Sequence, residues 1–312
     1  DGRFLALNSY ENRVYQVGIE DDKPIVVKYY RPNRWSDQAI LEEHRFTQEL
    51  ADLEIPVIAP QFFRDTDDER SETLHTWQGF RFALYPLRGG RSPELDNLDH
   101  LRWMGRFIGR IHAVSTLTTF ADRPVFSVES FGQESFEYLM SSQFIPFELE
   151  KSYESIVKQI LEMINSLYPL NCANFIRLHG DCHPGNILWT DRGPHFVDFD
   201  DARMGPAIQD LWMLLSGDRE SMCQQVSVIL EGYTEFFNFD PVEINLIESL
   251  RSLRMINYSA WLARRWSDPA FPISFPWFDS NRFWEDHILA LKEQLSALQE
   301  EPISWTLDGR CN

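Results

Sequence analysis

The sequence predicts an α+β protein with a small antiparallel β-sheet and one helix at its N-terminal end and a mainly helical remainder. Short β-branched and aromatic runs separated by polar turns fill the first part of the chain. Longer segments with apolar residues at helical spacing fill the rest. The run Pro86-Leu87-Arg88-Gly89-Gly90-Arg91 is the single crossing between these two patterns. The domain boundary is therefore expected between residues 87 and 88.

Short strands are expected along the first part of the chain. Residues 25–30, Ile-Val-Val-Lys-Tyr-Tyr, are β-branched and aromatic, and turn clusters rich in Asn, Asp, Glu and Pro precede them. Strands joined by such short turns form an antiparallel meander. Ser36 is a suitable N-cap for a helix that ends near Leu53, because apolar residues recur between them at helical spacing. The expected strands span residues 3–7, 14–19, 25–30, 62–63 and 80–85.

Helices are expected to dominate the second part. Residues 97–115 place six apolar side chains on one face, whereas residues 116–150 show no clear pattern. Two short buried strands are expected at residues 175–178 and 195–197, on either side of a loop. The further expected helices span residues 151–168, 206–216, 219–236, 241–266 and 280–299.

Composition and charge exclude several classes of function. The chain has 48 acidic residues against 29 Lys and Arg, a formal net charge of −19, which argues against sequence-independent binding to nucleic acid or to an anionic membrane. No run of 18 apolar residues exists, and no basic stretch followed by an apolar one opens the chain, so neither a membrane span nor a secretory signal is expected. The four cysteines lack CxxC spacing, so reduced thiols are expected rather than a disulfide framework or a structural zinc site.

The most informative segment reads His-Gly-Asp-Cys-His-Pro-Gly-Asn over residues 179–186. Asp181 and Asn186 are five residues apart on the loop, and Asp198 ends an apolar strand twelve residues later. In phosphoryl transfer, one carboxylate orients the attacking hydroxyl, while an amide oxygen and a second carboxylate bind the divalent cation that contacts the nucleotide phosphates. The ordered set therefore indicates a phosphotransferase more strongly than any of its residues alone.

These motifs resemble the aminoglycoside phosphotransferase and choline kinase superfamily, whose loop reads H-G-D-x-x-x-x-N with a later Asp. The resemblance implies a bilobal protein-kinase-like fold with a β-sheet lobe at residues 1–87 and a larger helical lobe at residues 88–312. Longer strings over nearly the whole chain resemble the bacterial stress response kinase A subgroup. That likeness implies an ATP-dependent Ser/Thr protein kinase of the cytoplasm, acting in stress response. The strings are Leu7–Gln16, Val27–Pro32, Leu178–Trp189, Asp198–Arg203 and Trp261–Pro272.

The resemblance also implies roles for the loop residues. Asp181 is the catalytic aspartate, and Asn186 and Asp198 bind Mg²⁺, so Asp198 is counted as both a catalytic residue and a metal ligand. Asp210, at the start of a helix, accepts backbone N–H groups of the catalytic loop and thereby positions it. His112 and His179 are expected to be structural, the first in the core and the second as a brace for the loop.

Lys28, at the end of the third strand, is the residue implied to pair with the α- and β-phosphates of ATP. Its apolar neighbours in the strand favour a buried lysine with a functional role over a solvated lysine. Its partner is expected to be a Glu on the next helix, and both Glu42 and Glu43 qualify. The family's usual spacing to Ile55-Pro56-Val57 selects Glu43, which leaves Glu42 as an exposed acidic residue.

The turn expected over the phosphates departs from protein kinases, because G-x-G-x-x-G is absent and residues 8–12 read Asn-Ser-Tyr-Glu-Asn without a glycine. A small polar side chain can still donate a hydrogen bond to a phosphate, and Ser9 is the candidate; a plain polar hairpin is the alternative. Residues 80–87 are expected to form the strand and hinge against which adenine lies, with Tyr85 and Leu87 contributing backbone groups and an apolar wall. An ordinary connector is the alternative there.

Two other functions remain open on the sequence. A metal-dependent hydrolase would use His179, Asp181 and His183 as metal ligands. A small-molecule kinase would phosphorylate a cationic alcohol such as choline or an aminoglycoside, which the acidic composition suits. The expected partners are ATP, Mg²⁺ and a protein substrate bearing Ser or Thr, or else a small alcohol. A monomer without a nucleic-acid or membrane partner is expected.

Overall fold

The computed structural model describes residues 3–7, 9–64, 71–167, 173–303 and 305. Contacts divide the chain into two compact units, the first made of Asp1–Pro124 and Ile176–Phe239, the second of Val125–Phe175 and Asp240–Asn312. The boundary predicted between residues 87 and 88 lies inside the first unit. Beyond that boundary Arg91 forms a β-bridge with Trp189, so the chain directly after residue 87 pairs with a strand of the same unit. The division into lobes at residue 87 stays a prediction.

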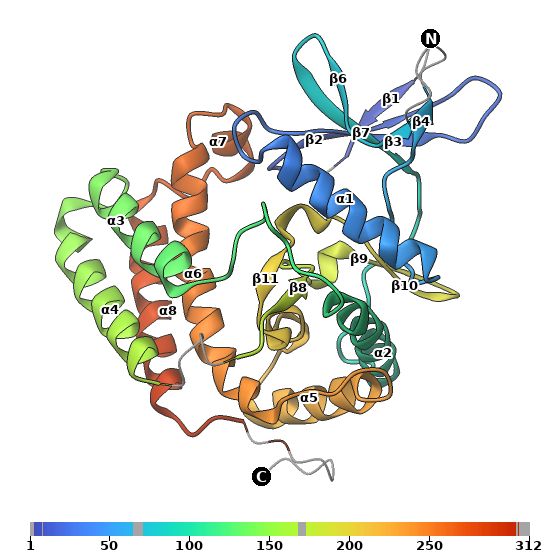
Figure 1. Cartoon of the computed structure of the whole chain (residues 1–312). Helices are drawn as coiled ribbons and strands as arrows, with labels where there is room; N and C mark the ends of the chain where they lie inside the picture. The colour runs from blue at the N-terminus through green and yellow to red at the C-terminus, as the bar shows by residue number, and fades with distance from the viewer. Residues whose placement is uncertain (1–2, 8, 65–70, 168–172, 304, 306–312) are drawn as a thin grey trace. The chain divides into compact units, whose positions relative to one another are not determined.

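A five-stranded antiparallel sheet forms the N-terminal part of the first unit (Figure 1). Its order is β1-β2-β3-β7-β6, and the register pairs Lys28 with Val14 on one side and Ala83 on the other. The predicted meander of the first three strands is confirmed, and β6 was not predicted. A separate pair, β4 and β5, lies between the helix and β6 in the chain. The strands span Phe4–Ala6 (β1), Arg13–Val17 (β2), Ile25–Tyr29 (β3), Phe63–Arg64 (β4), Ser71–Glu72 (β5), His75–Trp77 (β6) and Phe80–Pro86 (β7).

Helix α1, Asp37–Asp52, follows the third strand as predicted. The Ser36 hydroxyl accepts a hydrogen bond from the Ala39 N–H at 3.1 Å and so satisfies one of the free donors at the helix start. Ile40, Phe46 and Leu50 are fully buried on its inner face. This buried face fixes the rotation of the helix and thereby the direction in which its acidic residues point.

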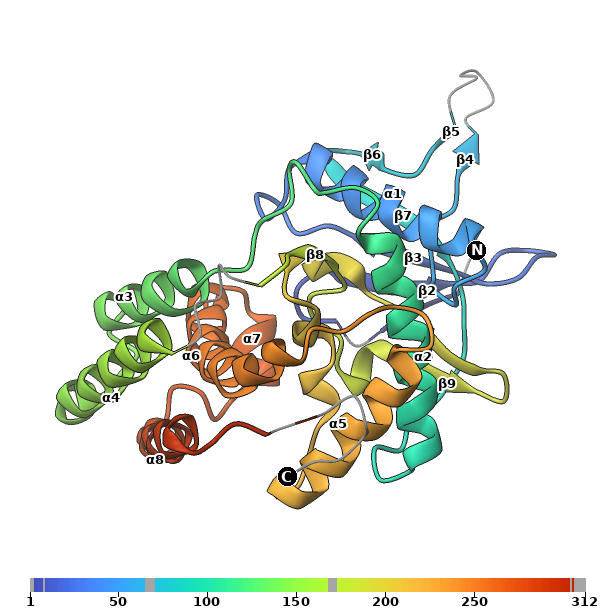
Figure 2. The ribbon, with the colours of Figure 1, turned by 60° about the horizontal axis from the view of Figure 1, so that its bottom comes forward.

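The segment of the first unit that contains Asp181, Asn186 and Asp198 is built from two short antiparallel pairs, β8 with β11 and β9 with β10. Helices α2 and α5 pack against each other beside them (Figure 2). The helix predicted at 206–216 is wrong: two 3-10 turns, Ala207–Asp210 and Trp212–Leu214, stand there. Apolar residues three apart suit both helix types, so periodicity did not separate them. The elements span Leu98–Ser115 (α2), Ile176–Leu178 (β8), Ile187–Thr190 (β9), Gly193–Phe196 (β10), Arg203–Gly205 (β11) and Arg219–Tyr233 (α5).

The second unit is helical. Its core contains the fully buried Tyr153, Phe278 and Trp284, and the rings of Tyr153 and Trp284 meet edge to face at 5.8 Å. The stretch predicted to lack a pattern contains α3 and the start of α4, so the latter begins earlier than expected. The helices span Glu134–Ser141 (α3), Phe147–Ser166 (α4), Ile247–Arg265 (α6), Ala270–Ser274 (α7) and Asn281–Gln299 (α8).

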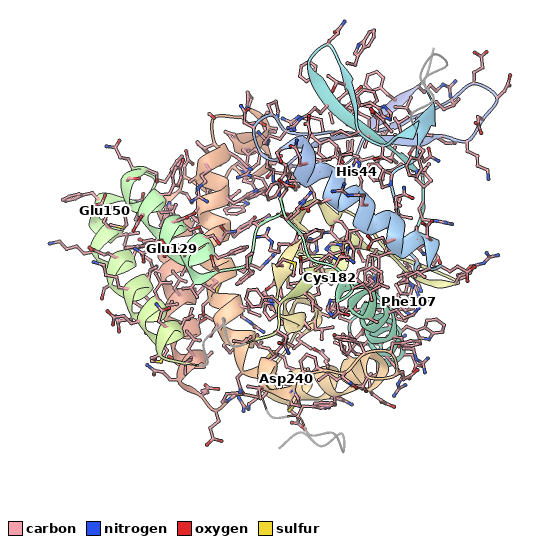
Figure 3. All side chains as sticks on the ribbon, viewed as in Figure 1. His44, Phe107, Glu129, Glu150, Cys182 and Asp240 are labelled. Atoms are coloured by element: carbon pink, nitrogen blue, oxygen red, sulfur yellow. The ribbon has the colours of Figure 1, made fainter. Side chains whose placement is uncertain are left out.

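Two expectations from composition can be compared with the fold. None of the helices in the described ranges combines the length and apolar composition that crossing a membrane requires. Cys182 is a free buried thiol, and burial raises its pKa well above the ordinary value (Figure 3). Cys223 is disulfide-bonded, so the expectation of reduced thiols is wrong at that residue. Spacing along the chain does not reveal which thiols meet in the fold.

Candidate active site

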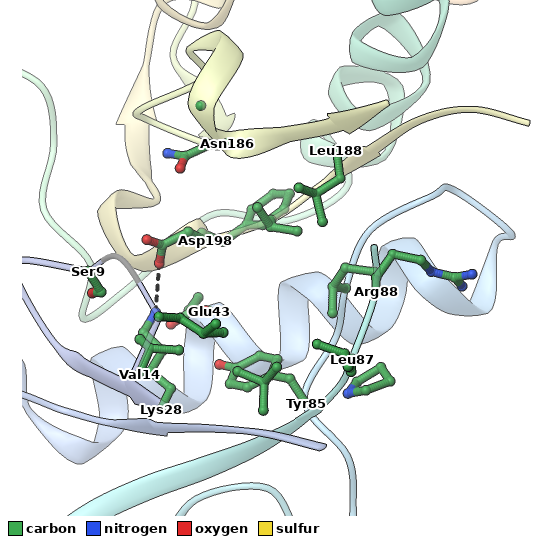
Figure 4. A pocket seen from close by; sticks show the side chains of 17 residues that line it. Ser9, Val14, Lys28, Glu43, Tyr85, Leu87, Arg88, Asn186, Leu188 and Asp198 are labelled. Atoms are coloured by element: carbon green, nitrogen blue, oxygen red, sulfur yellow. Dashed lines mark hydrogen bonds and ion pairs between the residues drawn. The ribbon is translucent and has the colours of Figure 1, made fainter. Parts of the chain in front are cut away.

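A cavity of about 310 Å³ lies in the first unit, between the sheet, the hinge and the segment that follows β8. That size lies within the range of small-molecule sites. Figure 4 shows Ser9, Lys28, Asn186 and Asp198 at one end of the cavity and Tyr85 and Leu87 at the other. Seven of the eight predicted site residues line this cavity, and Asp181 does not. The seven are Ser9, Lys28, Glu43, Tyr85, Leu87, Asn186 and Asp198.

Strand β3 places Lys28 at the polar end of the cavity. The residue is 5% exposed, and its Nζ lies 2.9 Å from Asp198 Oδ1 and 3.2 Å from Asp200 Oδ1. Burial alone would lower the pKa of Lys28, but the carboxylates of Asp198 and Glu43 outweigh burial and raise that pKa above its ordinary value. Lys28 is therefore a buried, permanently charged ammonium directed at the segment that contains Asp198.

Glu43, the predicted partner of Lys28, lines the cavity but makes its ion pair elsewhere. Its Oε2 lies 3.3 Å from the Arg123 guanidinium, and both side chains are buried. Arg123 also donates to the carbonyl oxygens of Ala39 at 2.8 Å and Asp200 at 2.6 Å. Helix α1 and the chain after Asp198 are thus joined through one guanidinium. A direct contact between Lys28 and Glu43 stays a prediction.

Glu42 was expected to be exposed, and this is wrong. It is 8% exposed, and its carboxylate accepts three backbone N–H groups, from Ala121 at 2.7 Å, Asp122 at 2.8 Å and Arg123 at 2.9 Å. Charge-assisted hydrogen bonds of this kind offset the cost of burying a carboxylate. The segment that receives this contact was assigned no structure from the sequence, so nothing indicated a partner for Glu42. The two adjacent glutamates both point inward, with different partners.

The loop that contains His179 is positioned by Asp210, as predicted. The Asp210 carboxylate accepts the N–H of His179 at 2.7 Å and the N–H of Gly180 at 2.9 Å. It also contacts His112 Nε2 at 3.2 Å, and the other ring nitrogen of His112 contacts the Tyr233 hydroxyl at 2.8 Å. His112 is therefore a fully buried and satisfied core residue, as expected. Asp210 itself is 1% exposed, so the brace lies behind the loop and not in the cavity.

Gly180 is the residue that the sharp loop requires. Its φ is +85°, and a Cβ at this position would lie 2.1 Å from the Asp201 carbonyl oxygen. Any side chain would therefore combine backbone strain with a collision against another backbone segment. Without a side chain, Gly180 can lie directly against the chain that follows Asp198, and Asp181 comes next in the loop.

Asp181 and Asn186 close the loop on each other. Asn186 Nδ2 donates to the Asp181 carbonyl oxygen at 3.0 Å and lies 3.5 Å from Asp181 Oδ2. With its nitrogen engaged in this way, the amide leaves Oδ1 available to the cavity. Asp181 itself is partly exposed, and its Oδ2 lies 3.4 Å from His183 Nε2. The catalytic candidate and the metal-ligand candidate are thus fixed relative to each other by the loop itself.

Asp198 stands in an unusual backbone conformation. Its φ of 61° and ψ of 63° lie in the left-handed region, where a residue with a side chain is strained. The side chain is 48% exposed and lines the cavity beside Asn186. Together the two supply carboxylate and amide oxygens without a thiolate or imidazole, a donor set that suits Mg²⁺. The residues present therefore fit the metal that the motif implies.

The metal-dependent hydrolase reading does not fit. His179 Nδ1 accepts the Asp181 N–H at 3.3 Å, and its Nε2 donates to the Val197 carbonyl at 2.9 Å, so both ring nitrogens are engaged. Over the part of the chain that the structure describes, no group of three His, Cys, Asp or Glu side chains is arranged to bind a metal. His179 braces the loop, as expected.

The apolar end of the cavity is backed by a buried polar chain. The Tyr85 hydroxyl contacts the Tyr30 hydroxyl at 3.0 Å, which in turn contacts His44 Nε2 at 2.6 Å. His44 Nδ1 contacts the Thr73 hydroxyl at 2.8 Å, and burial lowers the pKa of His44 to about 4. This chain anchors β7 to α1, the helix on which Figure 3 labels His44.

Three residues at the site were missed from the sequence: Arg34, Arg123 and Asp200. Each makes at least one ion pair or carbonyl contact with a residue 77 or more positions away. The printed sequence has no local pattern for such contacts. The only available signal was the position of Asp200 two residues after Asp198.

Comparison with known proteins agrees with this geometry. The profile of the phosphotransferase enzyme family matches residues 3–244. Stress response kinase A of Escherichia coli (strain K12) is 44% identical over 306 residues, which cover 98% of this chain and 91% of that protein. Serine/threonine protein kinase RdoA of Salmonella typhimurium is also 44% identical, with the same coverage.

Solved structures show the same fold at low sequence identity. Amicoumacin kinase hAmiN, in complex with AMP-PNP, Ca²⁺ and Ami, has a TM-score of 0.71 at 18% identity and covers 96% of this chain and 89% of its own. Choline kinase from Cryptosporidium parvum has a TM-score of 0.62 at 14% identity, with 96% and 90% covered. The predicted kinase-like fold is confirmed. On the family match, the identity over nearly the whole chain and the shared fold, this chain belongs to the phosphotransferase enzyme family and is a kinase.

Proposed function

We propose that this kinase transfers the terminal phosphoryl group of Mg²⁺-bound ATP to a Ser or Thr hydroxyl of a protein substrate, in a bacterial stress response. The observation that carries the chemistry is the gathering of Lys28, Asn186 and Asp198 at one end of a single cavity. Two relatives are 44% identical over 98% of the chain: the name serine/threonine protein kinase RdoA supports the protein substrate, and the name stress response kinase A supports the role in stress response.

Each end of the cavity suits one part of ATP. The wall near Tyr85 and Leu87 is apolar, with Val26, Ile58 and Leu188 beside them, and it fits the flat adenine ring. At the other end the Lys28 ammonium neutralises negative charge on the phosphates, and the Ser9 hydroxyl donates a hydrogen bond to them. Bound Mg²⁺, with Asn186 and Asp198 as its ligands, would add further positive charge at the phosphates.

Asp181 orients the substrate hydroxyl. It lies outside the cavity lining and beside Asn186, which supports a place for its carboxylate on the substrate side of the loop. An aspartate there accepts the hydroxyl proton as the phosphoryl group is transferred. Catalysis in this scheme is positioning and charge stabilisation, without a covalent enzyme intermediate.

The substrate class is tested by a competition of acceptors. Purified protein is incubated with radiolabelled ATP and Mg²⁺, together with a generic basic protein, choline or an aminoglycoside, and Asp181→Asn is the control. We expect label on Ser or Thr of the protein acceptor and none on the small alcohols. Label only on choline or the aminoglycoside would contradict the protein-kinase assignment while leaving the phosphotransferase site intact.

A further inference from the structure

The turn beside the phosphate end of the cavity lacks the glycines that normally allow backbone N–H groups to approach phosphates. Residues 9–12 are instead held by side chains from the loop after β3. Arg31 donates to the carbonyl oxygens of Glu11 at 2.9 Å and Tyr10 at 3.2 Å, and the buried Asn12 side chain accepts the Arg31 N–H at 3.1 Å. The turn therefore has a defined shape without glycine.

Arg34 extends this support to the other side of the cavity. Its Nε lies 3.4 Å from Glu11 Oε1, its second guanidinium nitrogen contacts Asp200, and its third lies 2.8 Å from Asp201 Oδ1. Each nitrogen of the fork thus faces a different carboxylate. The Arg34 side chain is 12% exposed and the Asp200 side chain 4% exposed, so the pair of Arg34 with Asp200 is shielded from solvent, unlike ordinary surface ion pairs.

The three carboxylates that Arg34 contacts belong to two different parts of the proposed phosphate site. Glu11 is two residues from Ser9, whereas Asp200 and Asp201 directly follow Asp198 and Phe199. Asp200 also lies 3.2 Å from Lys28 Nζ. One guanidinium consequently connects the turn to the segment that contains the proposed metal ligand and to the neighbourhood of the lysine.

We propose that Arg34 is a positioning residue that fixes the phosphate-side turn of residues 9–12 relative to Asp198. This inference rests on the proposed function, because it assigns the turn to the phosphates of ATP. Arg34 substitutes a long-range ionic connection for the glycine-rich backbone of other kinases. Its planar fork is required, since a lysine ammonium carries its donors on one nitrogen and cannot reach three separate carboxylates in the fixed geometry of a guanidinium.

The test compares two ligands that differ only in their phosphates. Affinities of Arg34→Ala for ATP with Mg²⁺ and for adenosine are measured by titration calorimetry, beside the wild type. We expect ATP affinity to fall about tenfold or more, a loss of ~1.4 kcal/mol, with adenosine affinity within about twofold of the wild type. Arg34→Lys should recover less than half of the lost ATP binding energy. Equal losses for both ligands, or no loss for ATP, would overturn the assignment.

Two further variants serve as a control for the loss of an arginine and as a second test of the connection. Arg106→Ala removes another arginine that pairs with a carboxylate, Glu235 at 2.9 Å, on the surface of α2, and it should change neither affinity. Glu11→Gln removes the carboxylate charge that faces Arg34 Nε at 3.4 Å and Arg31 Nε at 3.3 Å, but leaves the contacts of Arg34 with Asp200 and Asp201. It should weaken ATP binding selectively, and adding Arg34→Ala should cause less than the sum of the two losses.

The Glu11→Gln variant also carries the test if Arg34→Ala does not fold. Full additivity of the two losses, or a Glu11→Gln protein with unchanged ATP affinity, would contradict the connection. Failure of the proposed function has a separate signature, because the wild type itself would then neither bind ATP nor transfer its phosphate.

Discussion

The catalytic loop and the phosphate-side turn are built on opposite principles. The loop of residues 179–186 is closed by the hydrogen bond from Asn186 to Asp181 and is braced by residues at most 31 positions away, through hydrogen bonds with Val197, Gln209 and Asp210. The turn of residues 9–12 is held by Arg31 and Arg34, and Arg34 reaches carboxylates more than 160 positions away. A locally closed loop displays its chemistry as a motif, whereas a turn held by distant charges does not.

The largest expected effect belongs to the loop. Asp181→Asn should lower the rate of phosphoryl transfer by about 10³-fold or more, because the proton acceptor for the substrate hydroxyl is removed. ATP affinity should stay within about twofold, since Asp181 does not line the cavity. Steady-state kinetics and calorimetry on the same preparation check both points. Retained turnover would remove Asp181 from its assigned role.

The second effect concerns the sheet side and its buried histidine. His44 has a pKa of about 4 in the folded protein against 6.5 in an unfolded chain, so between these values only the unfolded state takes up the proton. Stability should therefore fall as the pH drops from about 6.5 to about 4, by about 3 kcal/mol from this residue.

Urea unfolding at several pH values measures that contribution. His44→Gln should have a flatter stability profile over this range than the wild type, while His287, whose pKa burial also lowers to about 4, titrates in both proteins. Parallel profiles for the two proteins would show that burial does not hold His44 neutral in the folded protein.

The third effect returns to the loop side of the cavity. Asp198→Ala should weaken Mg²⁺-dependent nucleotide binding by about 100-fold, or ~2.7 kcal/mol, because a carboxylate ligand and the ion-pair partner of Lys28 are both lost. Calorimetric titration of ATP with and without Mg²⁺ gives this value. If the affinity with Mg²⁺ is unchanged, Asp198 is not a metal ligand.

The smallest effect is expected at the turn. Ser9→Ala should lower ATP affinity about fivefold, equivalent to one hydrogen bond of about 1 kcal/mol, and should leave adenosine affinity unchanged. The comparison with Arg34→Ala separates the hydroxyl from the shape of the turn. An unaltered ATP affinity would support the plain polar hairpin.

The sequence predicted the parts of the site that local patterns encode. Ser36 as a helix cap, the antiparallel meander, and the positions of Asn186 and Asp198 in one cavity follow from spacing and from residue type. The three hydrogen bonds to the buried Glu42 carboxylate could not be predicted from the sequence. Their donors are backbone N–H groups at residues 121–123, which almost any sequence supplies. The guanidinium contacts of Arg34 and Arg123 were missed because their partners become neighbours only in the folded chain.

The most direct test of the account is a crystal structure with Mg²⁺ and a non-hydrolysable ATP analogue. We expect a magnesium ion bound by Asn186 and Asp198 at about 2.1 Å, adenine against Tyr85 and Leu87, and the Lys28 ammonium on the phosphates. A nucleotide bound outside this cavity, or a metal bound without either oxygen ligand, would contradict the account.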